Sequence, residues 1–187
     1  MDANENPKKV QSRQVRIYFS YEGRRRLDIG AMVKIGDRFE WIYFDHPKLS
    51  DPEDESNWLI RHIDGIPKPW EKDEGQLDWL EMQLNPKLES TWICCWDHAL
   101  VSRGQDSSFR NQNIVMLMEN IDGEILEETS FSPEKGNFGI IARIKLNYED
   151  KDIHIHQMDV GIVFPSLLEF NTQIIAGKPE EVRGIFK

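Results

Sequence analysis

Cysteine is nearly absent from this 187-residue sequence, because only Cys94 and Cys95 occur and they are neighbours. Two adjacent cysteines cannot build the disulfide framework of a small secreted domain, which favours a reducing compartment. Long apolar runs are also missing, and the polar start, MDANENPKKVQSRQ, lacks the apolar core of a signal peptide. We therefore expect a soluble, intracellular (cytoplasmic) protein without a membrane span.

The glycine-rich motifs that cradle phosphates are missing as well. The sequence contains neither Gly-x-x-x-x-Gly-Lys-Ser/Thr nor Gly-x-Gly-x-x-Gly, which excludes the common nucleotide-binding loops. No spacing in the chain assembles a nucleophile, a base and a stabilising group, so we expect a protein that is not an enzyme. Apolar residues make up 39% and charged residues 30% of the chain, which is typical of a globular domain.

Negative charge dominates, but it is unevenly distributed. The net charge is -10, yet residues 1–27 carry seven Lys or Arg residues against three Asp or Glu residues. That segment therefore has a net charge of +4 and the remainder -14. A basic end on an acidic body can pair with an anionic partner or with the body of another copy.

Alternating apolar and polar residues predict strands through most of the chain. The segment 15–21, VRIYFSY, alternates with a period of two, as a half-buried strand does. Short turn sequences at 36–38, 121–123 and 149–152 join successive strands as hairpins, which implies antiparallel pairing. The segment 39–44 has apolar residues on both faces, so we place it in the middle of a sheet.

Two segments after the third predicted strand carry helix signals. Residues 50–65 offer an N-cap before Pro52, acidic residues in the first turn and Gly65 as a stop. On this predicted helix His62 lies on the apolar side, which indicates a packed histidine and not a ligand. Residues 74–84 place leucines at helical spacing and end before a proline.

These elements predict an α+β, mostly β fold. We expect a large antiparallel sheet, curled into a sandwich or partial barrel, with two helices inserted after the third strand. Residues 1–13 are expected to form a basic, flexible amino-terminal arm, and residues 14–187 a single domain.

The stretch STWICCWDHAL, residues 90–100, raises the question of a reactive thiol or a metal site. If it is a strand, Cys94 and Cys95 point to opposite faces, because successive side chains alternate. The two thiols then cannot act as a pair. Free cysteine is among the most buried residue types, so we interpret the stretch as a buried strand in which His98 shares the face of Cys94.

His154 and His156 are the strongest chemical candidates. Two histidines at i and i+2 on a strand share a face and could converge on one divalent metal with a distant third ligand. The pair resembles the first metal-binding motif of the cupins. Here Gln157, Met158 and Asp159 follow in place of the glutamate of that family, and no second cupin motif follows residue 160. The resemblance is confined to this short stretch, and we assign no family.

Arginines near the amino terminus form the second candidate site, which would bind an anion or a partner. Aromatic residues lie between them, as on nucleic-acid-binding surfaces, so nucleic acid would bind only through this basic region. Protection of a strand edge by charge is the simpler interpretation. The arginines are Arg13, Arg16, Arg24, Arg25 and Arg26.

Three functional hypotheses follow, in order of preference. The first is a non-enzymatic protein-interaction or assembly protein that binds a protein partner or itself and needs no cofactor; a viral or phage accessory or structural protein fits this profile. The second is a β-barrel protein that binds one divalent metal through His154 and His156. The third is an acidic inhibitor that occupies a nucleic-acid-binding enzyme, with Asp51, Glu53, Asp54 and Glu55 as its acidic residues.

Overall fold

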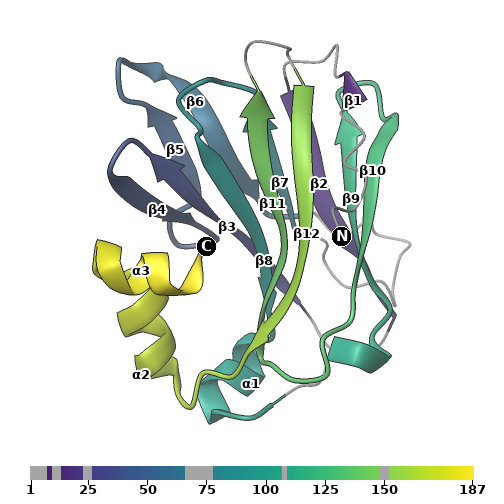
Figure 1. Cartoon of the computed structure of the whole chain (residues 1–187), viewed down its shortest axis with the longest axis vertical. Coiled ribbons are helices and arrows are strands. Elements are labelled where there is room, and N and C mark those ends of the chain that lie inside the picture. The colour runs from purple at the N-terminus through teal and green to yellow at the C-terminus, as the bar shows by residue number, and fades with distance from the viewer. Residues whose placement is uncertain (1–7, 10–13, 23–26, 66–77, 107–108, 148–151) are drawn as a thin grey trace.

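The computed structural model describes residues 8–9, 14–22, 27–65, 78–106, 109–147 and 152–187. Within these residues, the strands form two six-stranded antiparallel sheets that face each other as a sandwich (Figure 1). The first sheet, sheet A, has the spatial order β1 (Lys8–Lys9), β12 (Asp152–Ile162), β11 (Phe138–Asn147), β8 (Ser90–Trp96), β3 (Asp28–Ile35) and β4 (Arg38–Ile42). The second, sheet B, has the order β10 (Ile125–Phe131), β9 (Ile114–Asn120), β2 (Gln14–Ser20), β7 (Trp79–Gln83), β6 (Asp54–Ile63) and β5 (Lys48–Asp51).

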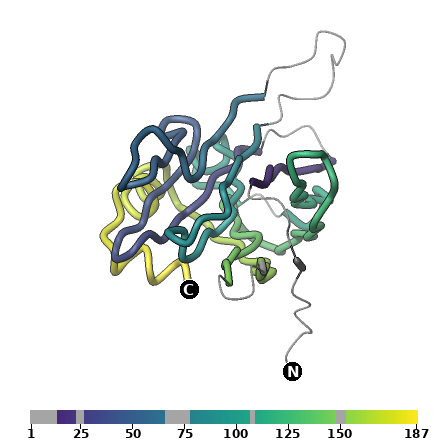
Figure 2. Tube along the Cα trace, turned by 90° about the horizontal axis from the view of Figure 1, so that it is seen from above, coloured from purple at the N-terminus to yellow at the C-terminus, as the bar shows by residue number. Residues whose placement is uncertain are grey.

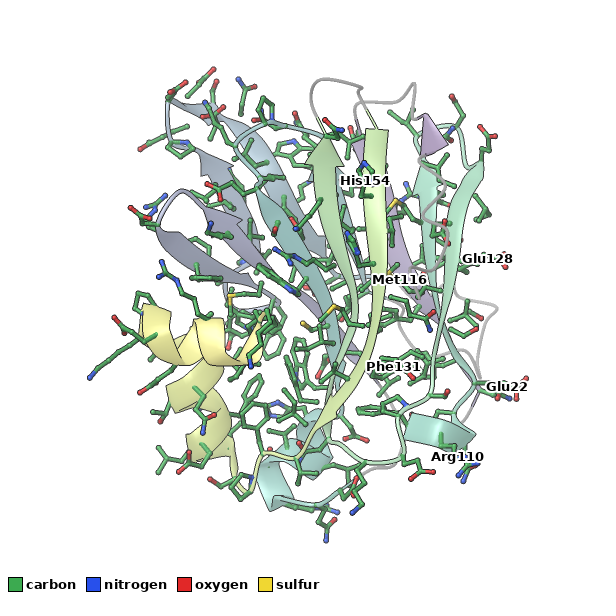
Figure 3. All side chains as sticks on the ribbon, viewed as in Figure 1. Glu22, Arg110, Met116, Glu128, Phe131 and His154 are labelled. Carbon is green, nitrogen blue, oxygen red and sulfur yellow. The ribbon has the colours of Figure 1, made fainter. Side chains whose placement is uncertain are left out.

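Alternation along the strands creates the inner core of the sandwich. In β2, Val15, Ile17 and Phe19 are buried while the residues between them are exposed or half-buried. Met116 of β9 and Phe131 of β10, labelled in Figure 3, belong to the same inner cluster. Burial of these side chains between the sheets supplies the main free energy of folding.

A second apolar cluster covers part of the outer face of sheet A. Its members include three tryptophans and several phenylalanines of sheet A and of the carboxy-terminal helices: Trp41, Trp92, Trp96, Phe138, Phe164, Phe170 and Phe186. The helical segments are α1 (His98–Arg103), the 3-10 turn η1 (Phe109–Asn111), α2 (Leu167–Phe170), the π-helical turn η2 (Asn171–Ile175) and α3 (Pro179–Ile185). Figures 1 and 2 show α2 and α3 on one outer side of the sandwich, so sheet A is buried on both faces there.

The predicted mostly β fold with antiparallel sheets is confirmed. The hairpins at 36–38 and 121–123 join β3 to β4 and β9 to β10, and β11 pairs with β12 across the predicted third turn. The segment 39–44 was wrongly placed in the middle of a sheet, because β4 is an edge strand of sheet A. Both of its faces are nevertheless covered: Trp41 lies in the outer cluster and Ile42 in the inner one.

The two helices predicted after the third strand are wrong. The described residues of these two segments instead lie in β5, β6 and β7 at one end of sheet B and in the connections beside these strands, while residues 74–77 lie outside the described residues. The acidic start that indicated a helix is a tight hairpin, in which the Asp51 carboxylate accepts from the Glu53 N–H at 2.9 Å. Asp54 likewise accepts from the Ser56 N–H at 3.1 Å. Short acidic side chains favour such local hydrogen bonds as readily as helix N-caps.

Most of the predicted basic arm, residues 1–13, lies outside the described residues. Lys8 and Lys9 form β1, which pairs with β12 at the edge of sheet A. Among the residues that the structure describes, no helix has the length and apolar composition needed to cross a membrane.

Candidate metal centre

Three potential metal ligands meet at one end of sheet B. His62 lies near the end of β6, Asp64 follows that strand, and Asp78 directly precedes β7. β6 and β7 are antiparallel neighbours, with His62 opposite Leu80 and Ile63 opposite Trp79. This pairing brings Asp64 and Asp78 to the same end of the sheet, although they are far apart in the sequence.

One ligand atom from each of His62, Asp64 and Asp78 lies within 4.8 Å of the others. His62 Nδ1 is 3.6 Å from Asp64 Oδ1, and His62 Nε2 is 3.7 Å from Asp78 Oδ2. The side chains of His62 and Asp78 are buried, with 1% and 3% exposed, whereas that of Asp64 is 72% exposed. Two of the three candidate ligands are therefore buried, and the third faces solvent.

The backbone next to the centre orients one of the carboxylates. The Gly65 N–H donates to Asp78 Oδ1 at 3.2 Å, which leaves Oδ2 facing the imidazole. The His62 N–H donates to the Pro47 carbonyl at 2.7 Å and fixes the backbone that carries the ring. Hydrogen bonds of this kind hold metal ligands in a defined orientation.

The sequence pattern did not indicate this group of residues. His62 is buried, as predicted, but on a strand and not on a helix. On a helix, His62 and Asp64 at i and i+2 do not face each other. Asp78 is separated from them by residues 66–77, which lie outside the described residues. The available signal was the position of Asp64 and Asp78 at the two ends of a connection between paired strands.

His154 and His156 lie together on β12, as predicted. Ile153 and Ile155 pack against the inner cluster, so the two histidines face outward from sheet A. Directly across on β11, Lys145 pairs with His154 and Arg143 with His156. Among the described residues, the two histidines do not join a third His, Cys, Asp or Glu in a group of three ligands.

The predicted arginine site is only partly described. Arg13, Arg24, Arg25 and Arg26 lie outside the described residues. Arg16 Nη1 forms an ion pair with Glu119 Oε1 at 2.8 Å, and its guanidinium lies 5.5 Å from the centre of the Trp79 ring. Arg16 therefore has partners within the protein.

The two cysteines are buried on opposite faces of β8, as predicted. Cys94 belongs to the outer cluster and Cys95 to the inner one. Burial raises the pKa of both thiols above the ordinary value, and proximity to Cys95 adds to the rise for Cys94. His98 was wrongly placed on this strand: Asp97 ends it and caps α1 by accepting from the Leu100 N–H at 3.1 Å.

The acidic hairpin between β5 and β6 has a lysine partner. Lys87 Nζ lies 2.5 Å from Asp51 Oδ1 and 2.8 Å from Glu53 Oε2. These contacts offset part of the negative charge on which the inhibitor hypothesis depends. That hypothesis stays a prediction.

A separate cleft of about 320 Å³ lies between β4 and the carboxy-terminal helices. Phe39, Trp41 and Tyr43 line one side, and Ile174 and Val182 the other. The residues lining it do not include any ligand of the metal centre or either histidine of β12.

The comparisons with known proteins give a fold and no function. No protein-family model matches the chain, and no curated protein matches it significantly. The structure is similar to the crystal structure of SAV2460, a protein of unknown function, with a TM-score of 0.53. The match covers 89% of this chain and 98% of the other at 13% sequence identity. At that identity the similarity shows a shared fold alone.

Proposed function

We propose that this protein binds a divalent cation through His62, Asp64 and Asp78. The observation that carries the proposal is the approach of three ligand atoms within 4.8 Å of one another, two of them on buried side chains.

The ligand types indicate which cations would bind. One imidazole nitrogen and two carboxylate oxygens suit Zn²⁺ or Mn²⁺ better than Ca²⁺, which prefers oxygen ligands alone. Three protein ligands leave a coordination position for water or a partner group. Because the Asp64 side chain is exposed, this position would open to solvent.

The same geometry suits a second chemical state, in which His62 is protonated. An imidazolium between Asp64 and Asp78 would form a charge triad without any metal, since its two ring nitrogens face one carboxylate each. The two states differ in their response to added metal, because only the first gains stability from it.

The experiment is a metal titration of the full chain, purified without a histidine tag and stripped with a chelator. We expect one equivalent of Zn²⁺ or Mn²⁺ to bind, as measured by calorimetry and by metal analysis after gel filtration. Asp64→Asn should weaken binding at least tenfold without loss of folding, because this side chain is mostly exposed.

Asp122→Asn is the matched control, since Asp122 is an exposed aspartate in the turn between β9 and β10. This variant should bind metal like the original chain. Metal-free protein that gains no stability from any of these ions would contradict the proposal and favour the charge triad.

Partner binding or self-association is a second candidate function, favoured by an open sheet edge. β10 ends sheet B with no further strand beside it among the described residues. Ile125, the first residue of β10, is 42% exposed, and Ile121, in the turn before it, is 71% exposed. Open edges with exposed apolar residues can pair with another chain. Sedimentation should show oligomers that dissociate with salt if charge contributes, and a monomer at every salt concentration would end this version.

A further inference from the structure

The outer face of sheet A carries four nitrogen-bearing side chains in two cross-strand pairs. Arg143 is opposite His156, and Lys145 is opposite His154; we call these four residues the basic array. Directly opposed residues lie about 5 Å apart between Cβ atoms, and i, i+2 neighbours on a strand about 7 Å apart. Figure 3 shows His154 on β12, near the end that is remote from α2 and α3.

Arg143 is held in a defined orientation by the neighbouring strand β8. Its Nε and Nη2 atoms donate to Ser90 Oγ at 3.3 Å and 3.1 Å. Its guanidinium also lies 4.9 Å from the centre of the Trp92 ring, a cation–π contact. These contacts occupy one side of the guanidinium, and among the described residues the N–H groups of Nη1 have no protein acceptor.

The positive charges of Arg143 and Lys145 have no carboxylate partner within the described part of the chain. Lys34, on the same sheet, shows the contrast, because its Nζ atom lies 2.6 Å from Glu89 Oε2. Burial lowers the pKa of the Arg143 guanidinium, as expected for a cation that has lost water and gained no anion. A half-buried arginine in this situation is costly unless an anion binds.

Arg143 and Lys145 also determine whether a ligand at His154 and His156 should be positively or negatively charged. A divalent metal on His154 and His156 would lie beside the positive charges of Lys145 and Arg143 and be repelled. An anion in the same place would gain attraction from both cations and could accept N–H bonds from the imidazoles. The array therefore favours an anion where the sequence alone indicates a metal.

We propose that the basic array binds the phosphoryl group of a small phosphorylated molecule. A phosphate monoester carries a charge of about -1.5 to -2 near neutral pH, which matches the two positive charges of Arg143 and Lys145. Arginine binds such oxygens through two parallel N–H groups, and lysine adds a point charge. The net charge of -10 would repel a long polyanion, so a small ligand is favoured over nucleic acid.

The test is a titration of the isotope-labelled full chain with inorganic phosphate, followed by nuclear magnetic resonance. We expect saturable shifts of the backbone signals of residues 143–145 and 154–156. Lys145→Gln should weaken phosphate binding at least tenfold, while Lys48→Gln, which changes an exposed lysine on β5, should leave it within twofold. Arg143→Lys keeps the charge and should weaken binding about threefold, through loss of the paired N–H groups.

Three results would overturn the proposal. The first is a phosphate affinity that Lys145→Gln and Arg143→Lys leave unchanged. The second is a set of chemical-shift changes that fall outside β11 and β12. The third is a single-stranded oligonucleotide that binds the array more tightly than phosphate does, which would assign the surface to nucleic acid. The backbone spectrum of each variant also shows whether it is folded, so the phosphate affinities are compared only between folded proteins.

Discussion

Two of the regions that contain histidine have opposite surroundings. At one end of sheet B, His62 lies between two carboxylates and is buried. On the outer face of sheet A, His154 and His156 lie opposite a lysine and an arginine. An imidazole can ligate a metal or donate to an anion, so the neighbouring charges determine which ligand it favours. The comparison teaches that the sign of these neighbours, and not the presence of histidine, predicts the ligand.

The largest expected effect is metal stabilisation of the original chain and its loss in Asp78→Asn. A cation at about 100 times its Kd stabilises the folded state by about 2.7 kcal/mol. For a chain of this size that corresponds to a rise in melting temperature of roughly 5 to 11 °C. Thermal unfolding monitored by circular dichroism, with and without Zn²⁺, measures it. An equal rise in Asp78→Asn would place the cation elsewhere.

A charge reversal in the basic array should give the next largest effect. Lys145→Glu puts a carboxylate opposite His154, so phosphate affinity should fall by about ten- to a hundredfold, or about 1.4 to 2.8 kcal/mol. The same variant should gain weak Zn²⁺ binding at β12, as measured by chemical shifts of residues 154–156. Unchanged preference for phosphate after the reversal would refute the rule that neighbouring charge sets the ligand.

A smaller effect is expected from Ser90→Ala. This change removes the acceptor of two Arg143 N–H groups but keeps every charge in the array. Phosphate affinity should fall about threefold through looser positioning of the guanidinium, with about 1 kcal/mol as the typical value of one hydrogen bond. Calorimetry with inorganic phosphate measures the affinity. In the Arg143→Lys background, Ser90→Ala should have almost no further effect on phosphate affinity. If the two substitutions lowered the binding free energy additively, Ser90 would not act by positioning the Arg143 guanidinium.

The smallest expected effect is a change in stability at the acidic hairpin between β5 and β6. Lys87 lowers the pKa of Asp51 below its ordinary value of 3.8, mainly through the hydrogen bond between them. A lowered folded-state pKa means that this contribution to stability is present above pH 3.8 and is lost as pH falls through the folded-state value. Lys87→Gln should therefore lower the melting temperature slightly at pH 7 and less at pH 2.

Substitutions in this hairpin should leave the affinity for metal unchanged, because Lys87 already neutralises part of the negative charge of the hairpin. Asp51→Asn is expected to leave the Zn²⁺ affinity unchanged in the same calorimetric titration. If Asp51→Asn weakened the binding as much as Asp64→Asn does, general acidity would explain metal binding better than the His62 geometry.

The hairpins of sheet A and of β9 and β10 could be predicted from the sequence, because their alternation has a period of two and their turns are short. β7 could not, although Leu80 and Met82 alternate with Glu81. Its leucines also fit helical spacing, and only pairing with β2 and β6 decides between the two. The carboxy-terminal helices were missed despite two signals, a capping serine at Ser166 and Pro179 at the first turn of α3.

The sites divide in the same way. Alternation placed His154 and His156 on one face correctly, because that information is local. The sign of their ligand depends on Arg143 and Lys145, which only the register of β11 against β12 places opposite them. The candidate metal centre includes Asp78, which reaches His62 through the pairing of β6 with β7. Both the cations opposite the histidines and the approach of Asp78 to His62 depend on how strands pair in the folded protein, so the sequence pattern alone does not reveal them.

The most direct test of the role of neighbouring charge is a pair of nuclear magnetic resonance titrations of the isotope-labelled full chain. One titration uses Zn²⁺ and the other uses inorganic phosphate. We predict that Zn²⁺ shifts the signals of residues 62–65 and 78–80 and that phosphate shifts those of residues 143–145 and 154–156. Zn²⁺ shifts centred on residues 154–156, or phosphate shifts at residues 62–65, would contradict the account.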